Sequence, residues 1–201
     1  MRICQSTVLA MLPLLLSSIA WSADYATGQD AYNSGDYETA LGEWQPLAEA
    51  GDANAQFGMG SLYGNGFGVA LDDAQALKWY GLAADQGQTD AQCSLAVMYA
   101  NGWGVPQSDE EAFKWYSLAA EQGVTAGQIN VARMYESGFG VAQDKVQGHK
   151  WFTIAVEMGE NDATQNRDLI AQIMSAEEIA ESDRLKNEWM ASHGHLLANQ
   201  D

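Results

Sequence analysis

The chain has 201 residues, and its 27 Asp and Glu outnumber its nine Lys and Arg, which gives a formal net charge of −18 at pH 7. Such a surface repels nucleic acid and anionic membranes, so nucleic-acid binding is excluded and a partner attracted by charge is basic. Solubility alone is the other explanation of the acidity. The length suits one domain or a short array of repeats.

Residues 1–22 have the layout of an export signal. Arg2 supplies a positive charge, residues 8–16 are apolar, and Ala20 and Ser22 place small residues where a signal peptidase reads them. The apolar stretch is shorter than the roughly 20 residues of a spanning helix. We therefore predict a signal peptide and an exported mature chain, periplasmic in a Gram-negative bacterium or otherwise secreted, without membrane insertion after cleavage. An uncleaved anchor or a buried helix is the alternative.

Cleavage would remove Arg2 and Cys4, which changes the formal net charge from −18 to −19. Cys93 is then the only cysteine, so no intrachain disulfide can form. Its position in a helical pattern predicts a small core residue rather than a nucleophile.

A segment of 28 residues, 24–51, precedes three blocks of equal length, 52–87, 88–123 and 124–159, which align without a gap. Nine columns are identical in the three blocks, a match that chance does not produce. These columns are Gln56/Gln92/Gln128, Tyr63/Tyr99/Tyr135, Gly66/Gly102/Gly138, Gly68/Gly104/Gly140, Val69/Val105/Val141, Lys78/Lys114/Lys150, Trp79/Trp115/Trp151, Ala83/Ala119/Ala155 and Gly87/Gly123/Gly159.

Apolar residues recur at helical spacing in each block, and no strand pattern occurs, which predicts two short helices joined by a glycine turn. The second helix should begin at an N-cap that fits or resembles a capping box, and it should end at a left-handed glycine. The predicted caps are Asp72, Ser108 and Asp144, and the predicted stops are Gly87, Gly123 and Gly159. The Trp column is predicted to be core, with the preceding lysines laying their stems over the rings.

The frame Ala-Gln, then Tyr-x-x-Gly-x-Gly-Val, then Ala-x-Lys-Trp resembles the Sel-one-like repeat, a branch of the tetratricopeptide (TPR) superfamily. Residues 24–51 look like an ordinary TPR helix pair with a shorter loop. Residues 160–195 keep helical spacing but lose the glycine turn, which is typical of carboxy-terminal capping helices, and 196–201 form a tail.

This resemblance implies an all-α fold, a right-handed α-solenoid of antiparallel helix pairs with a concave and a convex face. It also implies a non-catalytic interaction scaffold or regulatory adaptor, since exported bacterial members include partners of sensor kinases and of envelope assembly or polysaccharide systems. The expected partner is therefore a protein, basic or belonging to the envelope or a sensor.

Binding or hydrolysis of a small envelope ligand, such as a β-lactam or a peptidoglycan fragment, is the alternative. A cysteine-rich subgroup of the family has been linked to β-lactams, but it has paired cysteines in each repeat, and this chain has neither these nor a Ser-x-x-Lys or Gly-x-Ser-x-Gly motif. His149 stands alone and His193-x-His195 lies near a chain end, so no metal site is predicted. We therefore expect no enzyme activity and no cofactor.

Two sets of residues are candidates for partner binding. By analogy with TPR arrays, the first helix of each pair lines the inner face, where Gln56, Gln92 and Gln128 could bond a bound backbone; alternatively, these amides bond within the array. The second set stands between the paired glycines. These aromatic rings either pack on the adjacent repeat or form a ridge, one ring per repeat, that anchors a partner. They are Phe67, Trp103 and Phe139.

Overall fold

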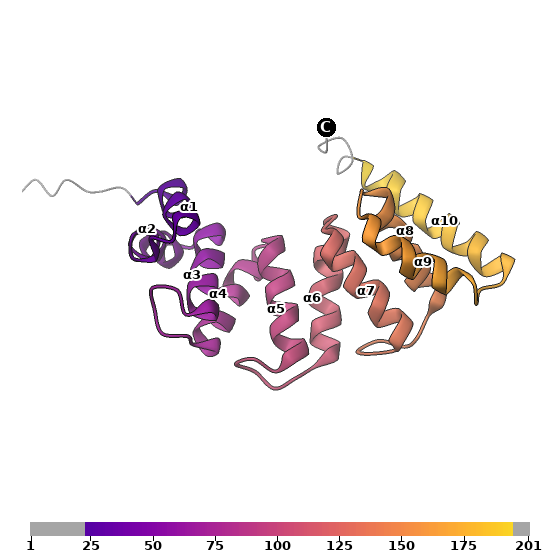
Figure 1. The fold of residues 1–201 in the computed structure, drawn as a ribbon, viewed down its shortest axis with the longest axis horizontal. Helices are drawn as coiled ribbons and strands as arrows, with labels where there is room; N and C mark the ends of the chain where they lie inside the picture. The colour runs from indigo at the N-terminus through magenta and orange to yellow at the C-terminus, as the bar shows by residue number, and fades with distance from the viewer. Residues whose placement is uncertain (1–22, 195–201) are drawn as a thin grey trace, which may run out of the picture.

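The computed structural model describes residues 23–194, which form helices stacked side by side along a curved array (Figure 1). The predicted signal peptide and the tail after residue 195 lie outside these residues. The helices are α1 (Tyr25–Ser34), α2 (Tyr37–Glu49), α3 (Ala53–Asn65), α4 (Asp73–Asp85), α5 (Thr89–Asn101), α6 (Asp109–Glu121), α7 (Thr125–Ser137), α8 (Lys145–Glu157), the 3-10 helix η1 (Asn161–Ala163), α9 (Thr164–Ala171) and α10 (Ala176–Ser192). No strand occurs within 23–194, and the predicted all-α solenoid is confirmed.

Each repeat contributes one helix pair, α3 with α4, α5 with α6 and α7 with α8, and each helix packs against its neighbours in the sequence. The helix pairs follow one another around an arc. The glycine loops within the pairs lie along the outer, lower edge of this arc in Figure 1. The repeated loops are therefore presented together on one edge of the molecule.

The second helix of each repeat begins at the predicted N-cap. Backbone N–H groups of the first turn donate to Asp72, Ser108 and Asp144 at distances of 3.0, 3.2 and 3.1 Å. The return bond of a full capping box is found within 23–194 only at Ser175, which Glu178 completes. In the second repeat Glu111 instead pairs with Lys114. The prediction of the caps is therefore confirmed, whereas the reciprocal box is wrong for these three helices.

Small residues let the helices approach closely, and large rings fill the space between them. Ala83, Ala119 and Ala155 are fully buried. Trp79 and Trp151 are also buried, and the lysines before the three tryptophans hold Nζ 4.9, 5.3 and 4.2 Å from the indole centroids. The ammonium groups rather than the predicted lysine stems thus lie over the rings. Trp115 is only partly buried, so the prediction of a core tryptophan is confirmed for two of the three repeats. Truncation of a buried ring to Ala would cost about 3–5 kcal/mol.

The amino-terminal pair is joined to the array through Trp44, which is buried between α1 and α3. A Cβ added at Gly28 or Gly58 would lie 2.5 Å from the Trp44 ring. These two glycines leave the room that the indole occupies, so the ring is held between the first pair and the first repeat.

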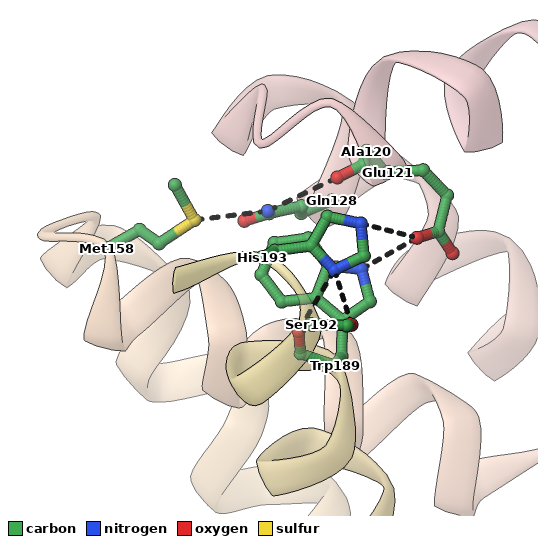
Figure 2. A network of polar contacts seen from close by, with 7 residues as sticks. All are labelled: Ala120, Glu121, Gln128, Met158, Trp189, Ser192 and His193. Carbon is green, nitrogen blue, oxygen red and sulfur yellow. Dashed lines mark hydrogen bonds and ion pairs between the residues drawn. The ribbon is translucent and has the colours of Figure 1, made fainter. Parts of the chain in front are cut away.

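At the other end, α10 packs on α8 and reaches back to the end of α6. The Trp189 indole donates from Nε1 to Glu121 Oε2 at 2.7 Å, and His193 stacks on that indole with centroids 4.3 Å apart (Figure 2). Trp189 also meets Trp151 edge to face at 5.6 Å. This helix therefore covers core residues that a further repeat would otherwise bury.

Candidate functional site

The three repeated glutamines lie inside the array rather than on its surface. Gln56, Gln92 and Gln128 are 4%, 3% and 0% exposed. Each side-chain amide donates to a backbone carbonyl of the preceding helix, at Ala48, Ala84 and Ala120. The expectation that they bond a partner's backbone is therefore not met, because their polar atoms lie where no partner reaches them.

In the first two repeats, the side-chain oxygens of these glutamines accept hydrogen bonds that join the first helix of the pair to the end of the second helix. Gln86 donates to Gln56 Oε1 at 2.7 Å, and Gln122 donates to Gln92 Oε1 at 2.8 Å. Met158 stands at the equivalent position of the third repeat, so Gln128 Nε2 contacts its sulfur at 3.2 Å and Gln128 Oε1 has no hydrogen-bond partner (Figure 2).

The second glycine of each loop meets the first residue of the second helix in the preceding pair. Gly68, Gly104 and Gly140 all have left-handed φ, at 68°, 68° and 70°. A Cβ would lie 2.8 Å from Tyr37 Cβ, 2.5 Å from the Asp73 carbonyl oxygen and 2.1 Å from the Asp109 carbonyl oxygen, respectively. Only glycine combines this backbone conformation with so close an approach. Each loop is therefore fixed to the pair before it.

The residue that each loop meets at the start of the preceding pair's second helix determines how far the ring between the two glycines is exposed. Phe67 is half-buried, because it stacks on Tyr37 with ring centroids 4.5 Å apart and an interplanar angle of 9°. Asp73 and Asp109 stand at the positions equivalent to Tyr37 and offer no ring. Trp103 and Phe139 are accordingly 50% and 64% exposed. The first ring thus packs on its neighbour, and the other two are presented to solvent.

A pocket of about 180 Å³ opens beside Trp103, between the first and second repeats. Tyr80 forms part of its wall and donates from its hydroxyl to Ser61 Oγ at 3.3 Å. The pKa of Tyr80 is raised, chiefly by burial, so this wall is uncharged. Asp73 is the one charged residue among those that line the pocket. The other residues in its lining are Gly64, Asn65, Ala76, Ser94, Val97 and Met98.

Neither of two potentially reactive side chains, Cys93 and His149, lines this pocket. Burial raises the pKa of the half-buried Cys93 thiol to about 11, with a further contribution from Asp90, so the group is a thiol and not a thiolate. Burial lowers the pKa of His149, whose Nδ1 lies 2.8 Å from Ser182 Oγ.

Residues 23–194 contain no group of three or more His, Cys, Asp or Glu side chains placed to hold a metal ion. None of the helices in this range has the length and apolar character that a membrane span needs.

Helix pairs stacked through a recurring glycine loop define an α-solenoid of the TPR-like class. The Sel1 repeat model matches residues 53–88, 89–124 and 125–160, and the chain belongs to the Sel1 repeat family. Each match begins one residue after the corresponding aligned block, 52–87, 88–123 or 124–159. No similar sequence was found among curated proteins.

Solved structures show the same fold. A crystal structure of c5321, a protective antigen in uropathogenic Escherichia coli strains, is 29% identical with a TM-score of 0.74, over 83% of this chain and 37% of that one. A Sel1 repeat protein from Oxalobacter formigenes is 31% identical with a TM-score of 0.70, over 73% and 60%. Cysteine rich protein B of Helicobacter pylori is 21% identical with a TM-score of 0.51, over 69% and 92%, and shows the fold alone.

Proposed function

We propose that this protein is an exported, non-catalytic scaffold of the cell envelope that binds a protein partner along its glycine-loop edge. Sel1 repeat proteins generally mediate protein–protein interaction, which supports this class of function. Export is supported by the signal-like layout of residues 1–22. The observation that carries the proposal is the exposure of Trp103 and Phe139 at equivalent positions of consecutive repeats.

These two rings have the properties of interface anchors. Aromatic side chains account for much of the binding energy at interfaces, and a residue that is already held in place loses less entropy on binding. Gly104 and Gly140 fix the loops against the preceding helix pair, so the rings are presented on a rigid edge. The same loop edge extends along the outer side of the arc (Figure 1).

The size of the pocket beside Trp103 also favours a protein partner. Pockets for drug-sized ligands measure roughly 300–1,000 Å³. At about 180 Å³, this pocket is smaller and has room for a single side chain. A protein that covers Trp103 could insert one residue here while its remaining contacts extend along the loop edge.

A pull-down from envelope extract tests the scaffold function. The purified protein is compared with a Trp103→Ser, Phe139→Ser double variant and with a control variant, Leu82→Ser, Leu118→Ser, which removes two equivalent exposed leucines from α4 and α6. We expect the same proteins to be retained by the native chain and by the control, and to be lost from the aromatic variant.

Binding should then be reproduced with the purified partner. A photocrosslinking amino acid placed at position 103 should label that partner, whereas one placed at position 82 should not. If no protein is retained by the native chain above background, or if the aromatic variant retains the same partner with unchanged affinity, the proposal is wrong.

A further inference from the structure

The pocket beside Trp103 exists where three positions carry small side chains. Gly64, Ser94 and Val97 line it at the junction of the first and second repeats. The equivalent positions one repeat later carry larger residues, Ala100, Asn130 and Arg133. The pocket at the first junction therefore depends on these smaller residues and is not a consequence of the repeat fold alone.

The pocket carries a negative charge that the described residues do not neutralise. No Lys or Arg lines it. The Asp73 carboxylate makes no ion pair or side-chain hydrogen bond with any other residue of 23–194, because Asp72 is the residue that caps α4. Residues 23–77 hold nine acidic side chains and no basic one. The electrostatic potential around this pocket therefore favours a cation.

The pocket also offers an aromatic surface to such a cation. Trp103 lies at the pocket with half of its surface exposed, and indole is the ring that attracts cations most strongly. The chain uses this chemistry within each repeat, where Lys78, Lys114 and Lys150 lie over indoles at 4.2–5.3 Å. A carboxylate and an indole thus meet in one pocket that is sized for one side chain.

The next junction provides an internal comparison. Asp109 and Phe139 are equivalent there to Asp73 and Trp103, and Arg133 replaces Val97. Arg133 therefore stands at the second junction where the first has the apolar Val97, but it is exposed and makes no ion pair with Asp109 within 23–194. The first junction has no basic residue at this position, so a cation that neutralises Asp73 must come from outside.

We propose that the pocket formed by Asp73, Tyr80, Val97 and Trp103 binds a Lys or Arg side chain of the protein partner. This inference rests on the scaffold function proposed above and specifies its partner: a segment that places a basic residue beside Trp103. The aliphatic stem packs on Val97 and Met98 while the charged head lies between the Asp73 carboxylate and the indole face.

An NMR titration of the ¹⁵N-labelled protein tests this assignment. The indole N–H resonance of Trp103 is assigned by its disappearance in Trp103→Phe. Four capped Gly-Gly-X-Gly-Gly peptides are then added, in which X is arginine, lysine, citrulline or norleucine. Citrulline keeps the shape of arginine without its charge, and norleucine keeps the stem of lysine without its ammonium. We expect the two charged peptides to shift the Trp103 resonance with affinities about fivefold or more above those of their neutral counterparts.

Three variants locate the interaction. Asp73→Asn should weaken binding of the arginine peptide about fivefold and leave the citrulline peptide unaffected. Val97→Arg should abolish binding, because it places the chain's own cation at the position where Arg133 stands one repeat later. Asp109→Asn is the matched control and should leave the titration unchanged. Equal binding of charged and neutral peptides, no response of Trp103 to any peptide, or an Asp73→Asn titration identical to that of the native protein would overturn the proposal.

The two proposals fail in different ways. If the pull-down retains a partner through Trp103 while the arginine peptide leaves Trp103 unaffected, the scaffold function stands and the cation pocket is wrong. If the peptides bind as expected but no protein is retained, the pocket is confirmed as a cation site and the scaffold function loses its support.

Discussion

Phe67 stacks on Tyr37, and the same contact cannot form in the next two repeats because Asp73 and Asp109 replace the tyrosine. One substitution at the start of a helix thus changes the role of a ring in the following repeat. Phe67 contributes to folding, whereas Trp103 remains available for binding.

Replacement of these two rings by serine should therefore affect stability differently. Phe67→Ser removes a half-buried ring that also packs against the Tyr32 ring, with ring centroids 6.2 Å apart. It should lower the free energy of unfolding by about 1.5–3 kcal/mol. Trp103→Ser should lower it by less, about 0.7–1.5 kcal/mol, since half of the side chain is exposed and no aromatic ring of residues 23–194 stacks on it. Urea unfolding followed by circular dichroism measures both changes. Equal losses for the two variants would contradict the division of roles.

The close approach of the loop to the preceding helix gives a second prediction. Gly104 and Gly87 both have left-handed φ, at 68° and 86°, but only Gly104 faces a neighbouring backbone. Gly87→Ala should cost about 1–2 kcal/mol, the penalty of the conformation alone. Gly104→Ala should cost more, because its Cβ would lie 2.5 Å from the Asp73 carbonyl oxygen.

Thermal unfolding of the two variants checks this difference. The loop in Gly104→Ala must also move, so the fluorescence of Trp103 should change in that variant and not in Gly87→Ala. If Gly104→Ala is no less stable than Gly87→Ala, the loop is not held by this contact.

The reactivity of Cys93 follows from its raised pKa. With a pKa of about 11, the thiolate fraction at pH 8 is about one thousandth, against about one tenth for a thiol at the ordinary value of 9. Since the thiolate is the reactive form, alkylation by iodoacetamide at pH 8 should be at least tenfold slower than that of a free thiol. A Cys4→Ser background leaves Cys93 as the only thiol, and mass spectrometry follows the reaction.

Unfolding provides the control for this measurement. In urea, labelling of Cys93 should reach the rate of a free thiol because the burial that raises the pKa is lost. Rapid labelling of the folded protein would show that the thiol is more accessible than the structure indicates.

The sequence predicted what lies within one repeat and left two alternatives open for what forms between repeats. The helix starts at Asp72 and Ser108 and the stops at Gly87 and Gly123 depend on residues close in sequence, so their patterns are local. The burial of the repeated glutamines and the difference between Phe67 and Trp103 depend instead on side chains of neighbouring pairs. An alignment of the repeats relates equivalent positions to one another. It does not show which residues at non-equivalent positions come into contact when the helix pairs stack.

Tyr37 illustrates this limit. It lies outside the three aligned blocks, in the pair that resembles an ordinary TPR unit, so nothing in the columns linked it to Phe67. The signal that could have found it is the residue at the equivalent position in each pair: Tyr37, Asp73 and Asp109 stand at the same helix start.

His149 gives a prediction about pH. Burial is the main cause of its lowered pKa, with Arg167 lowering it further and Asp183 and Asp168 opposing the shift. The unfolded chain takes up a proton near pH 6.5, whereas the folded chain does so only at lower pH. The stability that neutral His149 contributes is therefore present above pH 6.5 and is lost as the pH falls through 6.5 toward the folded pKa.

A His149→Asn variant isolates this contribution, because its amide can still bond Ser182 Oγ and does not titrate. The difference in free energy of unfolding between the native protein and the variant should shift in favour of the variant as the pH is lowered from about 7.5 to about 5.5. A difference that stays constant over this range would contradict the lowered pKa.

The glutamine connections predict unequal effects of one substitution in two repeats. Gln92→Met removes the bonds to Ala84 O and Gln122, and should lower the free energy of unfolding by about 1–3 kcal/mol. Gln128→Met should be close to neutral, because its Oε1 has no partner and its Nε2 meets only the Ala120 carbonyl and a thioether. Removal of an unsatisfied buried polar atom offsets the loss of these weak bonds.

The two substitutions are matched, since both replace a buried glutamine by a side chain of similar length at the same position of α5 and α7. Urea unfolding of both variants gives the comparison. A Gln122→Met variant adds the control, because it recreates in the second repeat the Met158 environment of the third. In that background Gln92→Met should cost less than in the native chain, since Gln92 Oε1 has already lost its donor. Additive losses would show that the Gln92–Gln122 bond does not stabilise the array.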